Sequence, residues 1–442
     1  MFNFFTITSL YLVLLFPPSI AYSESFDNSI SNKSCQLPAT FTSEALVLIA
    51  INCNANQKAL TSHWQAQKHH IEFSDSLDNP KISIGVAPQT FGEDKIDDGY
   101  IVNISQAIPW PGTLSLKKQA AKAKTDIWLE RRTQAKIMIA RDVRISVAQW
   151  HYHNQLLVIN KQHQQLWHTF IPIIRSNYAT GTSDFSAVLQ ATHEQHLLSQ
   201  ESIELSASIL RDVSQIKQLL NLPASSQLKN TNLLANTSIT LPNNIVEKLV
   251  SQLENQPLMQ SIDAQRRYKN IELKIAKKDR YPALSVVSRY NTLWMNESKR
   301  WIVGVGLNLP LDYGRRSKLE DSLRAEQDAI HWEQQDVLIQ LREQLFQSHS
   351  LFNQSKSVLQ LFQNELLPIA AENLTIARNE YQSGHSNFIS LLTAQRQSLT
   401  MQREAQTAVL DRTTNFAKLM NAAGLVKQKD WHSIFHIDIY EE

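Results

Sequence analysis

Four short segments of the chain alternate apolar residues with small or polar ones at a period of two. The clearest runs from Trp301 to Leu309, and similar segments begin after Pro80, near Val102 and after Pro282. This alternation is typical of β-strands that present one apolar face. The pattern alone leaves two interpretations open: a half-buried sheet on a soluble core, or a sheet that spans a membrane.

The segments between these strands have helical periodicity. One long segment carries apolar and aromatic residues at spacings of three and four, which indicates a coiled-coil-like packing stripe. The stripe consists of Ile145, Ala148, Tyr152, Leu156, Ile159, His163, Leu166, Phe170 and Ile173. Pro368 lies inside a second long segment and is expected to kink or interrupt it. The predicted helices cover residues 41–76, 116–178, 184–222, 244–279, 317–381 and 387–423.

The second half of the chain repeats the first, displaced by about 202 residues. Each half has the order helix, strand pair, long helix, glycine turn and helix, and the turn from Tyr178 to Phe185 recurs from Tyr381 to Phe388. The predicted division is a signal peptide (1–23), an N-terminal extension (24–40), a first repeat (41–222), a linker (223–243), a second repeat (244–424) and a tail (425–442).

Composition indicates a mainly helical chain. Only 10 of 442 residues are glycine, and each lies in or beside a predicted strand, turn or helix end. The stretches between them are rich in helix-forming residues. A net charge of +2 without a concentrated basic stripe disfavours binding to nucleic acid. No nucleophile and base stand in a recognisable catalytic context and no phosphate-binding glycine loop exists, so we expect neither an enzyme nor a cofactor.

The N-terminus resembles a secretory signal peptide. An apolar run from Ser9 to Phe16 precedes small residues around Ala21, although no Lys or Arg comes before the run. An uncleaved membrane anchor is the alternative. Cys35 and Cys53 could pair in an oxidising compartment or stay free, and the sequence leaves that question open.

Three features together favour a membrane sheet. The strands are close to the 9 to 11 residues of a membrane-spanning strand, they follow an export signal, and a helix of about 60 residues is roughly 90 Å long, too elongated for a compact core. Four strands cannot close a barrel, because about eight are needed. Since open edges in lipid leave backbone groups unpaired, the chain is expected to oligomerise.

The chain resembles the TolC-type outer-membrane efflux proteins over about residues 41–424. The resemblance rests on the duplicated element order, on the segments Asn255–Leu258, Tyr281–Leu284 and Gly304–Pro310, and on the paired glycine turns. The strand and Asn-x-Pro-Leu details look more like the heavy-metal cation branch of the family.

The resemblance implies a homotrimer in the outer membrane of a Gram-negative bacterium. Each protomer would give four strands to a twelve-stranded barrel and its helices to a long periplasmic tunnel of antiparallel helices. The implied partners are a second and third copy, a periplasmic adaptor, an inner-membrane efflux pump and outer-membrane lipid. The alternative is a periplasmic coiled-coil adaptor or scaffold without a pore.

Two groups of residues are candidates for function. The small or polar strand residues would line a water-filled lumen, with the loops 89–99 and 291–300 outside the cell. These residues are Ser83, Gly85, Ala87, Gly304, Gly306 and Asn308. The glycine turns would form the tips that dock an adaptor, or serve only as helix caps. The tip residues are Tyr178, Gly181, Ser183, Asp184, Phe185, Tyr381, Gly384, Ser386, Asn387 and Phe388.

Neither an acidic gate nor a metal site is predicted. Some family members carry rings of aspartate just after the second tip, where this chain has Ser390 and Thr393 as the possible lining of a constriction. Close histidine pairs occur at 69/70, 151/153 and 193/196, but no Cys or carboxylate completes a first shell at any of them.

Overall fold

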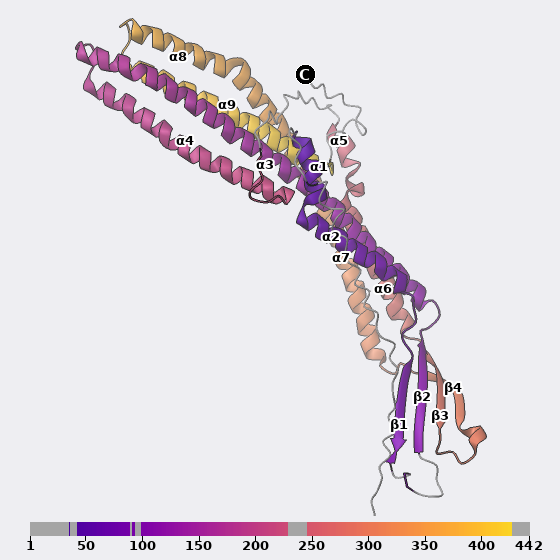
Figure 1. The fold of residues 1–442 in the computed structure, drawn as a ribbon. Helices are drawn as coiled ribbons and strands as arrows, with labels where there is room; N and C mark the ends of the chain where they lie inside the picture. The colour runs from indigo at the N-terminus through magenta and orange to yellow at the C-terminus, as the bar shows by residue number, and fades with distance from the viewer. Residues whose placement is uncertain (1–34, 36–41, 89–90, 93–98, 229–244, 427–442) are drawn as a thin grey trace, which may run out of the picture.

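The computed structural model describes residues 35, 42–88, 91–92, 99–228 and 245–426. The molecule is elongated, with a β-sheet at one end and two helical hairpin tips at the other (Figure 1). Most of the predicted signal peptide, N-terminal extension, linker and tail lies outside the described residues, as does much of the loop 89–99. The predicted fold class, mainly α with long antiparallel helices and four strands, is confirmed.

The order of elements is the same in the two halves. The first half contains α1 (Ser43–Cys53), α2 (Ala55–Phe73), β1 (Lys81–Ala87), β2 (Gly99–Ile108), α3 (Thr113–Ala179) and α4 (Phe185–Leu220). The second half contains α5 (Ile245–Val250), a 3₁₀ turn (Leu253–Asn255), α6 (Pro257–Lys278), β3 (Ala283–Asn291), a second 3₁₀ turn (Glu297–Lys299), β4 (Trp301–Asn308), α7 (Tyr313–Leu361), a π-helical turn (Phe362–Leu366), α8 (Leu367–Gln382) and α9 (Phe388–Ala422).

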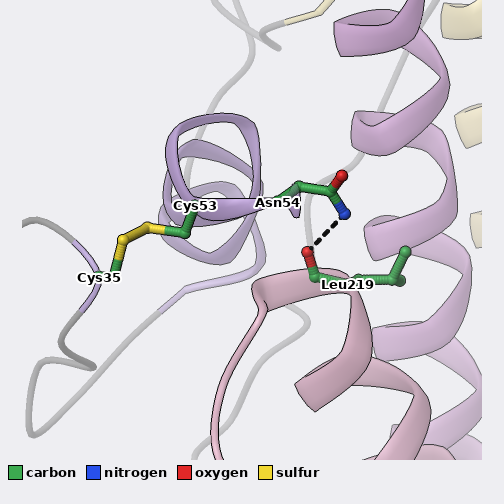
Figure 2. Close-up of a disulfide and its surroundings, with 4 residues drawn as sticks. All are labelled: Cys35, Cys53, Asn54 and Leu219. Atoms are coloured by element: carbon green, nitrogen blue, oxygen red, sulfur yellow. Dashed lines mark hydrogen bonds between the residues drawn. A yellow bond between two sulfur atoms is a disulfide. The ribbon is translucent and has the colours of Figure 1, made fainter. Parts of the chain in front are cut away.

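The first helix of each half is broken, where the sequence analysis wrongly predicted continuous helices at 41–76 and 244–279. Asn54 ends α1, and its side-chain oxygen accepts hydrogen bonds from the backbone N–H groups of Asn56 and Gln57, at 3.0 and 3.3 Å, to start α2. Its Nδ2 donates to the carbonyl oxygen of Leu219 in α4, at 2.9 Å (Figure 2). In the second half, Pro257 starts α6, because proline lacks the N–H that a helix interior requires.

The long helices agree with the prediction. The 67 residues of α3 correspond to roughly 100 Å, so this one helix runs from the sheet almost to the tips (Figure 1). The second long helical segment is interrupted as expected, because a π-helical turn (Phe362–Leu366) separates α7 from α8, which contains Pro368. Most of the predicted stripe on α3 is buried, including Leu156, His163 and Phe170.

The four strands form one antiparallel sheet in the order β1-β2-β3-β4, so that β1 and β4 are its edges. The register joins like faces across all four strands, because Ile84 lies opposite Val102, Val102 opposite Tyr290, and Tyr290 opposite Trp301. The apolar face carries Ile82, Ile84, Val86, Tyr100, Val102, Ile104, Ile108, Leu284, Val286, Tyr290, Trp301, Val303, Val305 and Leu307, together with Gln106 and Ser288.

The helices form two layers of four around the continuous α3. Near the sheet, the packing order is α2, α3, α6, α7, and at the tip end it is α4, α3, α9, α8. Buried clusters lie at the tips and at the level of the short helices α1 and α5.

A disulfide ties the N-terminal segment to the end of α1. Cys35 and Cys53, which the sequence left open, are joined with their Cα atoms 5.7 Å apart (Figure 2). Cys53 is fully buried, and the next residue is the Asn54 that contacts α4. The disulfide therefore lies where the two halves of the first repeat meet.

Candidate functional site

The polar face of the sheet brings together all six residues that were predicted to line a lumen. Ser83 lies opposite Asn103, Gly306 opposite Ser285, and Gly304 opposite Val287. The complete face also contains Lys81, Gly85, Ala87, Gly99, Ile101, Ser105, Ala107, Ala283, Arg289, Asn291, Ile302 and Asn308. Lys81 and Arg289 were missed by the sequence analysis, although their parity along β1 and β3 could have placed them on this face.

The glycines on this face do not have one common structural role. A Cβ at Gly306 would collide with the hydroxyl of Ser285, which donates to the carbonyl oxygen of Gly306 at 3.4 Å. A Cβ at Gly85 or Gly304 would meet nothing within 4 Å. A side chain at Gly306 would therefore require the Ser285 hydroxyl to move, whereas a side chain at Gly85 or Gly304 would project from this face into open space. Whether this face lines a lumen stays a prediction.

Both hairpin tips have the geometry expected of glycine-terminated helices. Gly181 and Gly384 have φ of +75° and +77°, in the left-handed region where a side chain is strained. At the first tip, Thr182 N–H donates to the carbonyl of Asn177 at 2.9 Å, and at the second, His385 N–H donates to that of Glu380 at 2.9 Å. These are the reversed hydrogen bonds that close a helix C-terminus.

Either Ser183 or Asp184 could cap the helix after the first tip, and either Ser386 or Asn387 the helix after the second, but only Asn387 does so. Its Oδ1 accepts from the backbone N–H of Ser390 at 2.9 Å. Asp184 occupies the corresponding position at the start of α4, but its side chain makes no capping hydrogen bond. Ser183 and Ser386 precede these cap positions, so the expected side-chain cap is present at the second tip and absent at the first.

An aromatic pair forms at each tip, but the two tips differ in exposure. The ring centroids are 5.3 Å apart for Tyr178 and Phe185, and 6.4 Å apart for Tyr381 and Phe388. Tyr178 and Phe185 are 48% and 52% exposed, whereas Tyr381 and Phe388 are 5% and 6% exposed. Trp167 of α3 covers Phe388. The first tip therefore presents an aromatic surface that the second tip keeps inside its core.

Ser390 and Thr393 lie on the exposed side of α9. The hydroxyl of Ser390 donates to Asn387 Oδ1 at 3.1 Å, and that of Thr393 donates to the carbonyl of Ile389 at 2.8 Å. Both groups are satisfied within their own helix and carry no charge. Their role in a constriction stays a prediction.

A set of polar links joins the two hairpins and was not found by the sequence analysis. Arg396 and Arg403 of α9 form ion pairs with Glu194 and Glu201 of α4. In each helix the two partners are seven residues apart, a spacing that could have indicated a charged ladder. Asn160 of α3 also donates to Glu201, at 2.7 Å, so three helices meet at this carboxylate.

His163 forms a second, buried link between the hairpins. Its Nε2 lies 3.2 Å from Oε1 of Gln402, and its Nδ1 lies 2.5 Å from Nε2 of Gln395. A neutral ring that donates from Nε2 and accepts at Nδ1 satisfies both contacts. Burial lowers the pKa of His163, which favours the neutral form.

Three histidines of the described helices pair individually or face solvent. His153 Nδ1 lies 2.6 Å from Asp212 Oδ2, and His193 and His196 are exposed on α4. In the described ranges, no three His, Cys, Asp or Glu side chains gather as a metal site. None of the described helices is long and apolar enough to cross a membrane.

The sheet meets the helices around a cavity of about 700 Å³. Trp110 and Tyr281 stack at its edge, with ring centroids 4.7 Å apart. Arg315 and Arg316, at the start of α7, are both held by Asp312, at 3.0 and 2.7 Å. Aromatic and cationic side chains therefore line the cavity where the sheet meets the helices.

The sequence and the fold both have relatives. Residues 249–425 match the family described as outer membrane efflux protein. No curated protein matches the chain significantly.

Among solved structures, CusC is 16% identical with a TM-score of 0.72, and the match covers 88% of this chain and 96% of CusC. The outer membrane protein VceC of Vibrio cholerae is 15% identical with a TM-score of 0.72, covering 87% and 97%. The open-state outer membrane channel MtrE of Neisseria gonorrhoeae is 14% identical with a TM-score of 0.73, covering 87% and 89%.

The family match spans the second repeat, and the structural likeness spans nearly all described elements. The family is one of efflux proteins rather than enzymes, and its description agrees with the predicted location in the outer membrane. The resemblance stated from the sequence is thereby confirmed. Residues 249–425 match the outer membrane efflux protein family, and the chain as a whole has the fold of the TolC-type channels.

Proposed function

We propose that three copies of this chain form the outer-membrane exit duct of a tripartite efflux system. One observation carries the proposal: the four-stranded sheet is apolar over most of one face and open at both edges. In lipid, each unpaired backbone group at an edge costs several kcal/mol, and four strands cannot close on themselves. Three copies would supply twelve strands, with β4 of one copy beside β1 of the next.

The helices near the sheet also support closure of three copies into one ring. The outer helices of this layer are α2 and α7. α7 exposes Trp332, Ile339 and Phe346, at intervals of seven residues, with 70%, 63% and 52% of each side chain exposed. α2 exposes small residues at spacings of three and four, Ala59, Ser62 and Ala66. Large residues on one edge and small residues on the other suit a coiled-coil contact between neighbouring copies.

The tip layer repeats this arrangement with α4 and α8 as its outer helices. α4 exposes Leu189, Ile203 and Leu210, and α8 exposes Ile369 and Ile376. Exposed apolar rows of this length are uncommon on a soluble monomer and usually mark an interface. We therefore place the α4 edge of one copy against the α8 edge of the next, which would enclose a tunnel continuous with the barrel.

In this assembly the duct conducts passively, and its partner proteins determine the direction of transport. The polar face of the sheet would line water, and the apolar face would contact outer-membrane lipid. The exposed Tyr178 and Phe185 support a periplasmic adaptor contact at the first tip, with the inner-membrane pump beyond it. No step in this function makes or breaks a covalent bond.

The proposal is tested by the mass and conductance of the protein extracted from membranes. We expect a detergent-solubilised particle with the protein mass of three chains, a gel mobility that changes on heating, and ion conductance in planar bilayers. Extraction by detergent-free buffer as a monomer would support the scaffold alternative and would contradict the duct.

A further inference from the structure

Both charged side chains on the polar face of the sheet are cationic. Lys81 is the first residue of β1 and lies opposite Ser105, while Arg289 of β3 lies opposite Asn103 and Ile302. The four described strands contain no Asp or Glu on either face. Neither Lys81 nor Arg289 forms an ion pair with a described residue.

The two cations lie at different depths of the sheet. Lys81 is the first residue of β1, and Arg289 is the seventh of nine residues in β3. The register places Arg289 level with Asn103 and Ser83, two residues farther along the strands than Lys81. Uncharged groups fill the face between them, among them Ser83, Asn103 and Ser105. A permeating ion would therefore pass two levels of positive charge and no negative charge on the walls of the barrel.

We propose that the barrel section favours anions over cations, so that the cargo of this duct is anionic or uncharged rather than a free metal cation. The inference rests on the proposed function, because only a closed trimer encloses the polar face. Charge on a narrow aqueous wall repels ions of like sign and concentrates the opposite sign. The heavy-metal cargo suggested by the family resemblance would have to pass this positive wall.

One further source of charge must be separated from the barrel wall. The sequence between β1 and β2 contains Glu93, Asp94, Asp97 and Asp98, which lie outside the described residues. Carboxylates in this segment would favour cations if they set the selectivity. A variant that neutralises all four therefore belongs in the test.

The experiment measures the reversal potential of the purified trimer in planar bilayers across a tenfold gradient of potassium chloride. One unit charge about 10 Å from an ion in water changes its local concentration about twofold, and salt screening weakens this effect. We expect a chloride-to-potassium permeability ratio of about two to four. The double variant K81Q/R289Q should bring the ratio toward one, and the double variant K81E/R289E should favour potassium.

The matched control is Lys299→Gln, which removes one positive charge from the 3₁₀ turn between β3 and β4, off the polar face. It should leave the ratio close to that of the parent. A channel that prefers potassium even after the four carboxylates are neutralised, an unchanged ratio in K81Q/R289Q, or a Lys299→Gln shift as large as that of K81Q/R289Q would each overturn the inference. A cation-selective channel would leave the duct itself intact, whereas a trimer without conductance would contradict the duct and the inference together.

Discussion

Ile84 provides the sharpest test of which face of the sheet meets lipid. It is the fourth of seven residues in β1, is 67% exposed, and lies opposite Val102 on the apolar face. Its neighbour Ser83 points to the polar face and lies opposite Asn103. We expect Ile84→Arg to prevent assembly in the membrane and Ser83→Arg to permit it, although the same residue is introduced one position apart in the same strand.

The size of the effect follows from the depth of the position. An arginine on the lipid face of a membrane barrel costs about 2–4 kcal/mol near the bilayer midplane and much less near the interfaces. The middle position of Ile84 in its strand corresponds to the deep case. At 1.4 kcal/mol per factor of ten, each protomer would lose roughly 30- to 700-fold in its folding equilibrium in the membrane. Ser83→Arg places its guanidinium in water and loses none of this.

The assay compares the heat-modifiable trimer band in purified outer membranes with the total chain detected after boiling. Ile84→Arg should give little or no trimer at equal expression, while Ser83→Arg should give a trimer at the level of the parent. Bilayer conductance of the Ser83→Arg trimer provides an independent check, because a bulky cation in the lumen should lower the current per channel.

Equal assembly of the two variants would refute the assignment of the apolar face to lipid. A sheet that is buried on a soluble core or exposed to water would not make Ile84→Arg defective and Ser83→Arg normal. A reversed result, with Ser83→Arg defective and Ile84→Arg normal, would place the polar face against lipid or protein and would reject the assigned lumen.

Three further predictions concern the helical part. Gly384→Val should abolish efflux but leave trimers in the membrane, because a branched residue at φ +77° costs about 1–2 kcal/mol and distorts the tip. Asparagine tolerates this conformation, so Gly384→Asn should retain more activity. Normal efflux by the valine variant would argue against adaptor docking at this tip. Cys53→Ser removes a disulfide with a sequence separation of 18 and should lower the free energy of unfolding by about 3 kcal/mol. The melting temperature should fall equally in Cys53→Ser, in Cys35→Ser and in the double variant. Because burial lowers the pKa of His163, its contribution to stability is present above the unfolded-state pKa of about 6.5 and is lost as the pH falls. The melting temperature of His163→Gln should therefore fall less than that of the parent between about pH 7 and pH 5. An equal fall in both proteins would show that His163 does not cause the pH dependence.

The faces of the sheet could be predicted from sequence because strand parity is a local property. Once Ile84 is assigned to one face, Ser83 must lie on the other, whatever pairs with them. The registers between strands confirmed this assignment across β2, β3 and β4. Lys81 and Arg289 obey the same parity and were missed only because the analysis followed the small residues.

The break at Asn54 could not be read from local pattern. Asparagine is common inside long polar helices, and the apolar spacing continues on both sides of it. What ends α1 is the tertiary contact of Asn54 with Leu219, which holds the side chain where its oxygen can cap α2. A residue 165 positions away thus decides the local structure.

The unequal tips have the same kind of cause. The two turns share their tyrosine, glycine and phenylalanine at equal spacing, so sequence predicts equal tips. Burial of Tyr381 and Phe388 comes from neighbours on other helices, including Trp167 of α3. At the first tip no described residue covers Tyr178 and Phe185 to the same extent.

The polar links between hairpins limit how the tip end of a trimer can change its width. Within one copy, Glu194 and Glu201 of α4 are paired with Arg396 and Arg403 of α9, and the buried His163 joins α3 to α9 beneath them. Separating the hairpins would break the hydrogen bonds of His163 to Gln395 and Gln402, each worth about 0.5–1.5 kcal/mol, together with both ion pairs. The α4 and α8 edges carry exposed apolar rows and no such buried network. Because the weaker contacts lie between copies, we expect a dilating tunnel to slide copies past one another and to keep the two hairpins of each copy together.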